Sequence, residues 1–347
     1  MESMQRNIKT GIILILFAGL LYMFYSITQF FYILFAAVLF AVFFTGCAEW
    51  LQKKTRLKYT YALTVVLITI SAIIIVGGIL LAPYMQQQIK EITETLPKTI
   101  AELKQKLMQN EQARNLMQKM PKDVGGLSQK GGSVFSNIGG AFSVMLDSIA
   151  YIFVILITGV YLAYSPALYR LGFLQLVKKE NQGDFWEAFN RTYTTLKHWL
   201  WARGITMLVV GIMSTTGLLL LKIPLAVPLG IIAGLLDFVP NVGPLIALIP
   251  ALLIAFTEGP ESALYVALLY FAIQTLEGFV LTPLIEKEQV SLPPALILVA
   301  QLFFGLVGGV IGLFLASPIL ATIIVFTKVF HVKKIRNDDE TAENTDS

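Results

Sequence analysis

The sequence predicts an all-α, polytopic integral membrane protein with about eight transmembrane spans, some of them interrupted. Of its 347 residues, 56% are hydrophobic and 14% are charged, whereas about 25% charged residues are usual in soluble globular chains. The apolar residues also form long runs, and no charged residue occurs from Thr10 to Ala48. Because a charge-free run of about 18 residues or more is typical of a membrane-spanning helix, these runs indicate spans rather than a soluble core.

Residues 1–83 are predicted to hold the first three transmembrane spans. The first two cover about 11–27 and 30–48, and the third covers about 61–82 before Pro83. Basic residues between the second and third spans mark a membrane interface, since lysine and arginine gather beside the cytoplasmic ends of spans. These residues are Lys53, Lys54, Arg56 and Lys58.

Residues 84–147 are predicted to form an inserted amphipathic helical hairpin outside the membrane. Apolar residues recur there every three or four positions, with lysine and glutamate between them, which is typical of an amphipathic helix. The first such stripe comprises Met85, Ile89, Ile92, Leu96, Ile100, Leu103 and Leu107. A second stripe begins at Ile138 and continues into span 4, residues 148–165. The two stripes can pack on each other alone, or they can also form a subunit interface.

Residues 166–203 are predicted to be amphipathic helices at the membrane interface. Basic residues alternate there with aromatic residues, including Trp186, Trp199 and Trp201. This composition favours a cytoplasmic membrane interface, and nucleic-acid binding does not fit a chain this apolar. Arg203 then opens the next span and is interpreted as an interfacial anchor.

Residues 204–330 are predicted to be a transmembrane core with broken helices. Two apolar tracts, 224–256 and 292–327, are longer than the roughly 20 residues of one straight span. Proline and glycine interrupt both tracts, and after each break Gly243–Pro250 loosely echoes Gly312–Pro318. Interrupted segments in corresponding positions indicate a transport site. Each tract can be a kinked span or a re-entrant pair.

The charge distribution predicts the orientation of the chain. Basic residues at the N-terminus, after span 2, after span 4 and after the last span all fall on one side of an eight-span arrangement. The positive-inside rule makes that side cytoplasmic, so both termini are expected in the cytoplasm and the hairpin outside. The tail, residues 331–347, is predicted to be disordered because it is strongly charged and contains few apolar residues.

Asp237 is the strongest single candidate for function. A carboxylate inside a membrane is unfavourable, and it is by default a functional residue. Asp237 could bind a cation, carry a proton or accept hydrogen bonds from a polar ligand. Alternatively, it could cap the half-helix that begins near Pro240.

Further polar residues in the apolar tracts complete the predicted substrate or ion pathway. Gln274 and Glu277 lie one turn apart and share a helix face, although Glu277 could instead lie at the membrane edge, paired with Arg203 or a lysine. Gln301 could instead make a helix–helix hydrogen bond. The predicted pathway comprises Asp237, Pro240, Asn241, Gly243, Gln274, Glu277, Thr282 and Gln301.

The sequence contains none of the common motifs of an enzyme or an ATP-driven pump. The phosphate loop G-x-x-x-x-G-K-[ST] is absent, as are H-E-x-x-H and G-x-S-x-G. The single cysteine, Cys47, excludes an intramolecular disulfide and a thiolate metal site. The chain is therefore not expected to be an enzyme, and no metal or cofactor is predicted.

Several ordered motifs lie within residues 200–328. They are Leu229–Pro244 with Asp237 at its centre, Gln274-Thr-Leu-Glu277-Gly278, Leu281-Thr-Pro283, Leu292-Pro-Pro294 and Gly309–Pro318. Together they resemble the signature of the autoinducer-2 exporter-like transporter family. The rest of the chain resembles that family more loosely, through its paired early spans and the helical segment inserted after span 3.

The resemblance implies a multi-pass permease of the bacterial inner membrane that has no ATPase. Some members of that family export the autoinducer-2 signal, and others are sodium(lithium)/proton antiporters. Homo-oligomers, pentamers among them, are implied as well, with membrane lipid and a small molecule or cation as the other partners. Asp237 stands where many relatives have asparagine, which favours coupling to a cation or a proton.

Two functions from different classes follow from these observations. The first is a secondary transporter that exports a small polar solute or exchanges cations. Asp237 and Glu277 would then be coupling carboxylates, and Asn241, Gln274 and the breaks would contact the ligand. The second is a membrane scaffold or assembly factor, whose hairpin binds partners and whose helix breaks serve packing alone.

Overall fold

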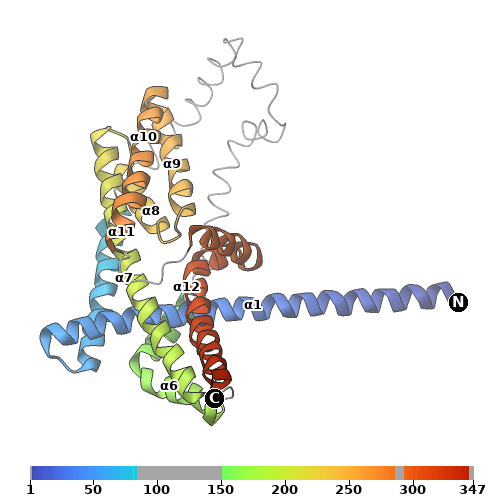
Figure 1. The fold of residues 1–347 in the computed structure, drawn as a ribbon. Coiled ribbons are helices and arrows are strands. Elements are labelled where there is room, and N and C mark those ends of the chain that lie inside the picture. Colours follow the sequence, from blue (N-terminus) through green and yellow to red (C-terminus); the bar gives the residue numbers. More distant parts are fainter. Residues whose placement is uncertain (1, 81, 84–150, 286–292, 344–347) are drawn as a thin grey trace. The chain divides into compact units, whose positions relative to one another are not determined.

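The computed structural model describes residues 2–80, 82–83, 151–285 and 293–343 (Figure 1). All regular secondary structure within these ranges is helical, which confirms the predicted all-α fold. Five of the described helices are long and apolar enough to cross a membrane, or up to six if a bent pair counts as one span. The predicted hairpin at 84–147 lies outside the described residues.

The N-terminal helix α1 runs without a break from Glu2 to Thr55. The two spans predicted at 11–27 and 30–48 are therefore parts of one helix. Neither glycine nor proline occurs between Gly19 and Gly46, so no residue in that stretch favours a turn. The merging of these two spans is one reason why the described residues hold fewer long helices than predicted.

The described chain forms two compact units. The first unit combines the N-terminal segment up to Val66, Tyr151–Lys197 and the C-terminal segment from Val290. The second unit holds the described residues within 67–83 and 198–285. Within the first unit, α1 packs against α12, which spans Pro294–Glu343.

The amphipathic region predicted at 166–203 begins as expected but does not end there. Helix α6 covers Pro166–Gln175, a short 3₁₀ turn η1 follows at Lys179–Asn181, and α7 then extends from Gln182 to Leu220. The interfacial segment and the following span thus share one helix. Gly204 is the only glycine near the predicted boundary, and a helix interior tolerates a single glycine at modest cost.

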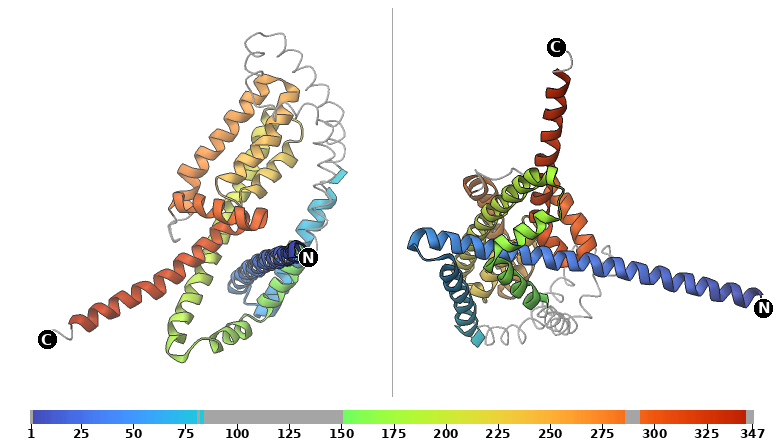
Figure 2. Two further views of the ribbon diagram at one scale, coloured as in Figure 1. Left: turned by 90° about the vertical axis from the view of Figure 1, so that its right-hand side faces the viewer. Right: turned by 90° about the horizontal axis from the view of Figure 1, so that it is seen from below.

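The second unit is built around the two short helices α8, Ala226–Leu236, and α9, Val242–Glu258. They pack against each other, and α9 packs against α10, Pro260–Leu276 (Figure 1 and Figure 2). The tract 224–256 is therefore a helical hairpin rather than a kinked span. Small and branched apolar side chains of α8, α9 and α10 form the buried core, together with Leu218 of α7.

Glycine permits a close backbone approach at both predicted helix breaks. A Cβ atom on Gly243 would collide with the carbonyl of Leu236, where the start of α9 meets the end of α8. A Cβ atom on Gly312 would collide with the carbonyl of Phe304, beside the break in α12 at Gly309, whose φ is 60°. These two glycines occupy corresponding positions in the similar segments Gly243–Pro250 and Gly312–Pro318. Each one allows a backbone carbonyl to approach closely.

The C-terminal half of α12 extends into the predicted tail. Its backbone is helical as far as Glu343, whereas the sequence predicts disorder from His331 onward. The described part of predicted span 4, 148–165, is a helix at Tyr151–Tyr164.

Candidate functional site

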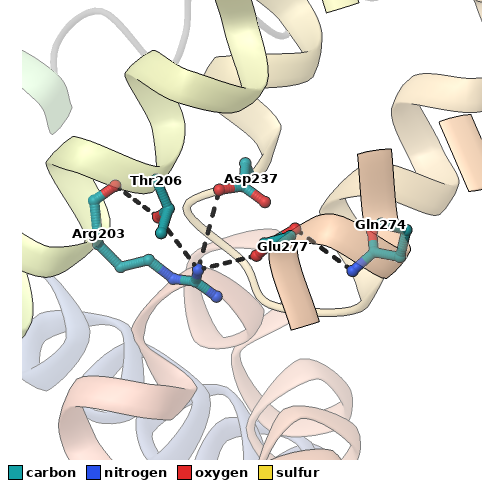
Figure 3. A network of polar contacts seen from close by, with 5 residues as sticks. All are labelled: Arg203, Thr206, Asp237, Gln274 and Glu277. Carbon is teal, nitrogen blue, oxygen red and sulfur yellow. Dashed lines mark hydrogen bonds and ion pairs between the residues drawn. The ribbon is translucent and has the colours of Figure 1, made fainter. Parts of the chain in front are cut away.

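A largely buried cluster of polar side chains in the second unit lies beside the middle of α7 and the ends of α8 and α10. Its members come from separate parts of the chain: Arg203, Thr206, Asp237, Gln274 and Glu277 (Figure 3). Arg203 lies at its centre, and its Nη1 atom is 3.3 Å from Glu277 Oε1 and 3.8 Å from Asp237 Oδ2. The structure thus brings together three of the predicted site residues.

Asp237 owes its position to the end of α8. It is the residue that follows the last helical residue, and its backbone N–H still donates to the carbonyl of Ala233 at 3.0 Å. Its side chain is fully buried, with 0% of its surface exposed. Neither carboxylate oxygen accepts a hydrogen bond from the described residues, since 3.8 Å to Arg203 is an ion-pair distance and too long for a hydrogen bond.

Glu277 is held more tightly than Asp237. It begins a single turn of π-helix, η2, Glu277–Leu281, which continues α10. Arg203 donates to its Oε1 at 3.3 Å, and Gln274 Nε2 donates to its Oε2 at 3.3 Å. Single π-helical turns within helices are frequent at functional sites, because the extra residue redirects a side chain.

The cluster contains more negatively charged than positively charged side chains. Two carboxyl groups, those of Asp237 and Glu277, share the one guanidinium of Arg203. All three side chains are buried, and a buried ion is stable only when it is paired and hydrogen-bonded. One additional positive charge, such as a proton or a monovalent cation, would make the cluster neutral.

Arg203 and Thr206 are site residues that the sequence analysis missed. Arg203 is only 6% exposed, so its interpretation as an interfacial anchor is wrong, whereas the alternative pairing of Glu277 with Arg203 is present. Thr206 lies one turn later on α7, where its hydroxyl accepts a hydrogen bond from Arg203 and donates to the Arg203 carbonyl at 2.9 Å. The sequence did contain one indication of Arg203. Two carboxylates within apolar tracts require a buried cation to pair with them.

Three other predicted residues, Pro240, Asn241 and Gly243, lie in the segment that follows Asp237 along the chain. Pro240 and Asn241 form the break between α8 and α9, and the side chain of Asn241 is exposed. Asn241 has a φ of 64°, and its side chain does not cap α9. Gly243 is buried against α8, so its role in the structure is packing.

Thr282 and Gln301 are the two predicted residues farthest along the chain. Thr282 begins the short helix α11, Thr282–Ile285, and is partly buried. Gln301 is 2% exposed on α12 and belongs to the first unit, so its part in the pathway stays a prediction. Within the described residues, no group of three or more His, Cys, Asp or Glu side chains could hold a metal ion.

The fold and the cluster define a multi-pass α-helical membrane protein with paired charges buried beside a helix break. A model described as the AI-2E family transporter matches residues 12–331, so the chain belongs to that family. This is a family of transporters rather than of enzymes, and it supports a permease role.

Individual relatives match this chain to different extents. The AI-2 transport protein TqsA of Escherichia coli is 24% identical over 332 residues, which cover 94% of this chain and 91% of TqsA. YueF of Bacillus subtilis is 28% identical over 46% of this chain and 43% of its own length. YrrI of the same organism is 31% identical over 39% of this chain and 37% of its own length. The matches to YueF and YrrI thus span less than half of those proteins.

Proposed function

We propose that this chain is a secondary transporter that exports a small polar solute, such as the autoinducer-2 signal. Membership of a transporter family and the similarity to TqsA along 94% of the chain support this proposal. The sequence also lacks a phosphate loop, which favours transport driven by an ion gradient rather than by ATP bound to this chain.

The proposal depends mainly on one observation, the buried carboxylate of Asp237. This group is fully buried, accepts no hydrogen bond from the described residues and shares its only cation with Glu277. A proton or a monovalent cation at Asp237 would remove the surplus negative charge. We therefore assign Asp237 as the coupling residue and Glu277 as its partner.

Binding of the coupling ion would change how the helices are held together. Arg203 on α7 attracts both the end of α8, through Asp237, and the start of η2, through Glu277. When a proton or cation neutralises Asp237, the attraction between α7 and α8 weakens while the pair of Arg203 and Glu277 remains. The coupling ion would thereby favour one arrangement of these helix ends over another, as alternating access requires.

The other predicted pathway residues have supporting parts in this proposal. Gln274 positions Glu277 through its hydrogen bond, and the break at Pro240, Asn241 and Gly243 leaves backbone groups beside Asp237. Broken helices of this kind supply backbone donors and acceptors to a transported solute. We propose Thr282 as a further contact along the same pathway.

Sodium(lithium)/proton antiport is the second candidate function. The observation that favours it is again the Asp237 carboxylate, whose oxygens accept no hydrogen bond within the described residues, because a carboxylate oxygen is a suitable ligand for a small hard cation. Exchange at a single carboxylate, where either a proton or a sodium ion binds, needs no separate binding site for a polar solute.

Transport by the purified full-length protein in proteoliposomes with an internal pH-sensitive dye tests both candidates. Vesicles would be given autoinducer-2, sodium, lithium or potassium in turn, with protein-free vesicles as the control. Movement of autoinducer-2 accompanied by a pH change supports the first candidate. A pH change with sodium or lithium alone supports the second, and the absence of any flux would favour a scaffold.

The cellular setting is also part of the proposal. We propose that the chain resides in a bacterial inner membrane, with both termini in the cytoplasm, and that it assembles into a homo-oligomer such as a pentamer. Native mass spectrometry of the purified protein would give the number of subunits. Labelling of single cysteines near each terminus, in a variant with Cys47 replaced by serine, would give the orientation.

A further inference from the structure

A cavity of about 330 Å³ lies in the first compact unit, which does not contain the Arg203 cluster. It is enclosed by α1, the start of the Tyr59–Leu80 helix, α6 and the N-terminal part of α7. Most of its wall is apolar or aromatic, and its polar side chains include Glu49, Arg170 and Tyr193. A wall of this kind suits a ligand with one charged end and an apolar body.

Arg170 reaches the cavity from α6 and is held by aromatic rings. Its guanidinium carbon lies 4.6 Å from the centre of the Trp186 ring and 5.8 Å from that of the Phe189 ring. Its Nη2 atom donates to Asn190 Oδ1 at 2.9 Å, but its buried Nε donates no hydrogen bond within the described residues. The planar guanidinium is thus stacked and fixed in place, and its buried Nε has no hydrogen-bond partner within the described residues.

Of the two charged residues that line the cavity, Glu49 and Arg170, only Glu49 has an ion-pair partner within the described residues. Glu49 is already occupied, because the Tyr193 hydroxyl donates to its Oε1 at 2.8 Å and Lys197 Nζ to its Oε2 at 2.8 Å. Arg170 forms no ion pair with any carboxylate in the described part of the chain. An anion in the cavity would therefore give Arg170 the partner that the described residues do not supply.

The helices beside the cavity are bent in a way that fits a membrane surface. The Tyr151–Tyr164 helix and α6 meet at 88°. The bend occurs because Ser165 precedes a proline, which disfavours helical backbone, and Ser165 has a φ of −131°. A helix at right angles to a span runs along the interface, where tryptophan, basic residues and lipid headgroups gather.

We propose that this cavity binds the phosphate-bearing headgroup of an acidic phospholipid, with the Arg170 guanidinium as the phosphate contact. A planar guanidinium is suited to phosphate oxygens, which accept its N–H groups in pairs. The aromatic and apolar wall would take the glycerol backbone and the first part of the acyl chains. This inference does not depend on the proposed transport function.

Lipid binding to the purified full-length protein tests the proposal. Native mass spectrometry would compare phosphatidylglycerol with phosphatidylcholine on the wild type, Arg170→Gln, Arg170→Lys and Arg191→Gln. Arg191 is the matched control, because it lies on α7 with 64% of its side chain exposed and pairs with Glu187. We expect the preference for phosphatidylglycerol to fall about tenfold or more in Arg170→Gln, since a hydrogen bond to a charged group is lost.

The two remaining variants are both expected to keep more of the preference for phosphatidylglycerol than Arg170→Gln does. Arg170→Lys keeps the charge but loses the planar guanidinium, so its preference should fall by less, and Arg191→Gln should match the wild type. Equal lipid preference in the wild type and both Arg170 variants would overturn the proposal. So would inorganic phosphate that competes as well as phosphatidylglycerol, because the cavity would then bind a free anion rather than a lipid.

Discussion

Arg203 is the one cation shared by two buried carboxylates that lie far apart in the sequence. Its Nη1 atom lies within 4 Å of both Asp237 and Glu277, at 3.8 Å and 3.3 Å. Removing one member of a buried ion pair leaves the other charge without compensation, which is far less favourable than removing both members together. The cluster is therefore expected to respond to mutation as a unit.

Arg203→Met is expected to lower the free energy of unfolding by about 3–5 kcal/mol, because two buried carboxylates lose their cation. The double variant Arg203→Met/Glu277→Met should be less destabilised than the sum of its single variants. Thermal unfolding of the purified protein would measure each change, with Arg191→Met as the exposed control. Additive effects of the two substitutions would show that Arg203 and Glu277 do not interact.

Two tyrosines, the half-buried Tyr59 and the buried Tyr270, differ in whether their hydroxyl has a hydrogen-bond partner. Tyr59 donates to the Ala163 carbonyl at 2.6 Å, whereas the Tyr270 hydroxyl, in the core of the second unit, has no hydrogen bond within the described residues. Tyr59→Phe should lower the free energy of unfolding by about 1 kcal/mol, and Tyr270→Phe should leave it unchanged or raise it by a similar amount. Opposite shifts in the unfolding midpoint are expected, and a loss of stability in Tyr270→Phe would contradict this account.

At the scale of whole elements, the two helix breaks could be predicted from sequence. Proline and glycine act locally, so their positions in the apolar tracts predict where α8 ends and where α12 breaks. The continuity of α1 and α7 could not be predicted. Charged residues indicate where a chain meets the membrane interface, but they do not indicate whether the helix ends there.

Only part of the candidate site could be predicted, because local sequence does not show which distant residues pack together. Polar residues within apolar tracts stand out one by one, which identifies Asp237 and Glu277. Arg203 lies beside basic and aromatic residues, so its local sequence is that of an interfacial anchor. Only the packing of α7 against the ends of α8 and α10 shows that Arg203 is buried between two carboxylates.

The glycines at the two breaks give a prediction for the elements they join. In Gly243→Ala the new Cβ collides with the Leu236 carbonyl, and in Gly312→Ala with the Phe304 carbonyl. Each substitution should lower the free energy of unfolding by about 1–3 kcal/mol, as overpacking usually does. Gly77→Ala is the control, because its Cβ meets nothing within 4 Å. Equal unfolding midpoints for all three variants would mean that neither break needs glycine.

At the scale of the whole molecule, the two compact units have different proposed roles. The second unit holds the break between α8 and α9 and the buried charges that we assign to coupling. The first unit holds the cavity around Arg170 and the second broken helix, α12. Transport and lipid binding can therefore be tested by substitutions in separate units.

The central claim is that Asp237 couples transport to a proton or a monovalent cation. It is tested most directly by the ion flux of Asp237→Asn in proteoliposomes, beside Glu277→Gln and the control Glu261→Gln, whose carboxylate is exposed at the start of α10. We predict that the coupled pH change falls at least about tenfold in Asp237→Asn and in Glu277→Gln. Each substitution replaces a carboxylate by a neutral amide, and a tenfold lower rate corresponds to a barrier about 1.4 kcal/mol higher. Glu261→Gln should transport like the wild type. A wild-type pH change in Asp237→Asn would contradict the account.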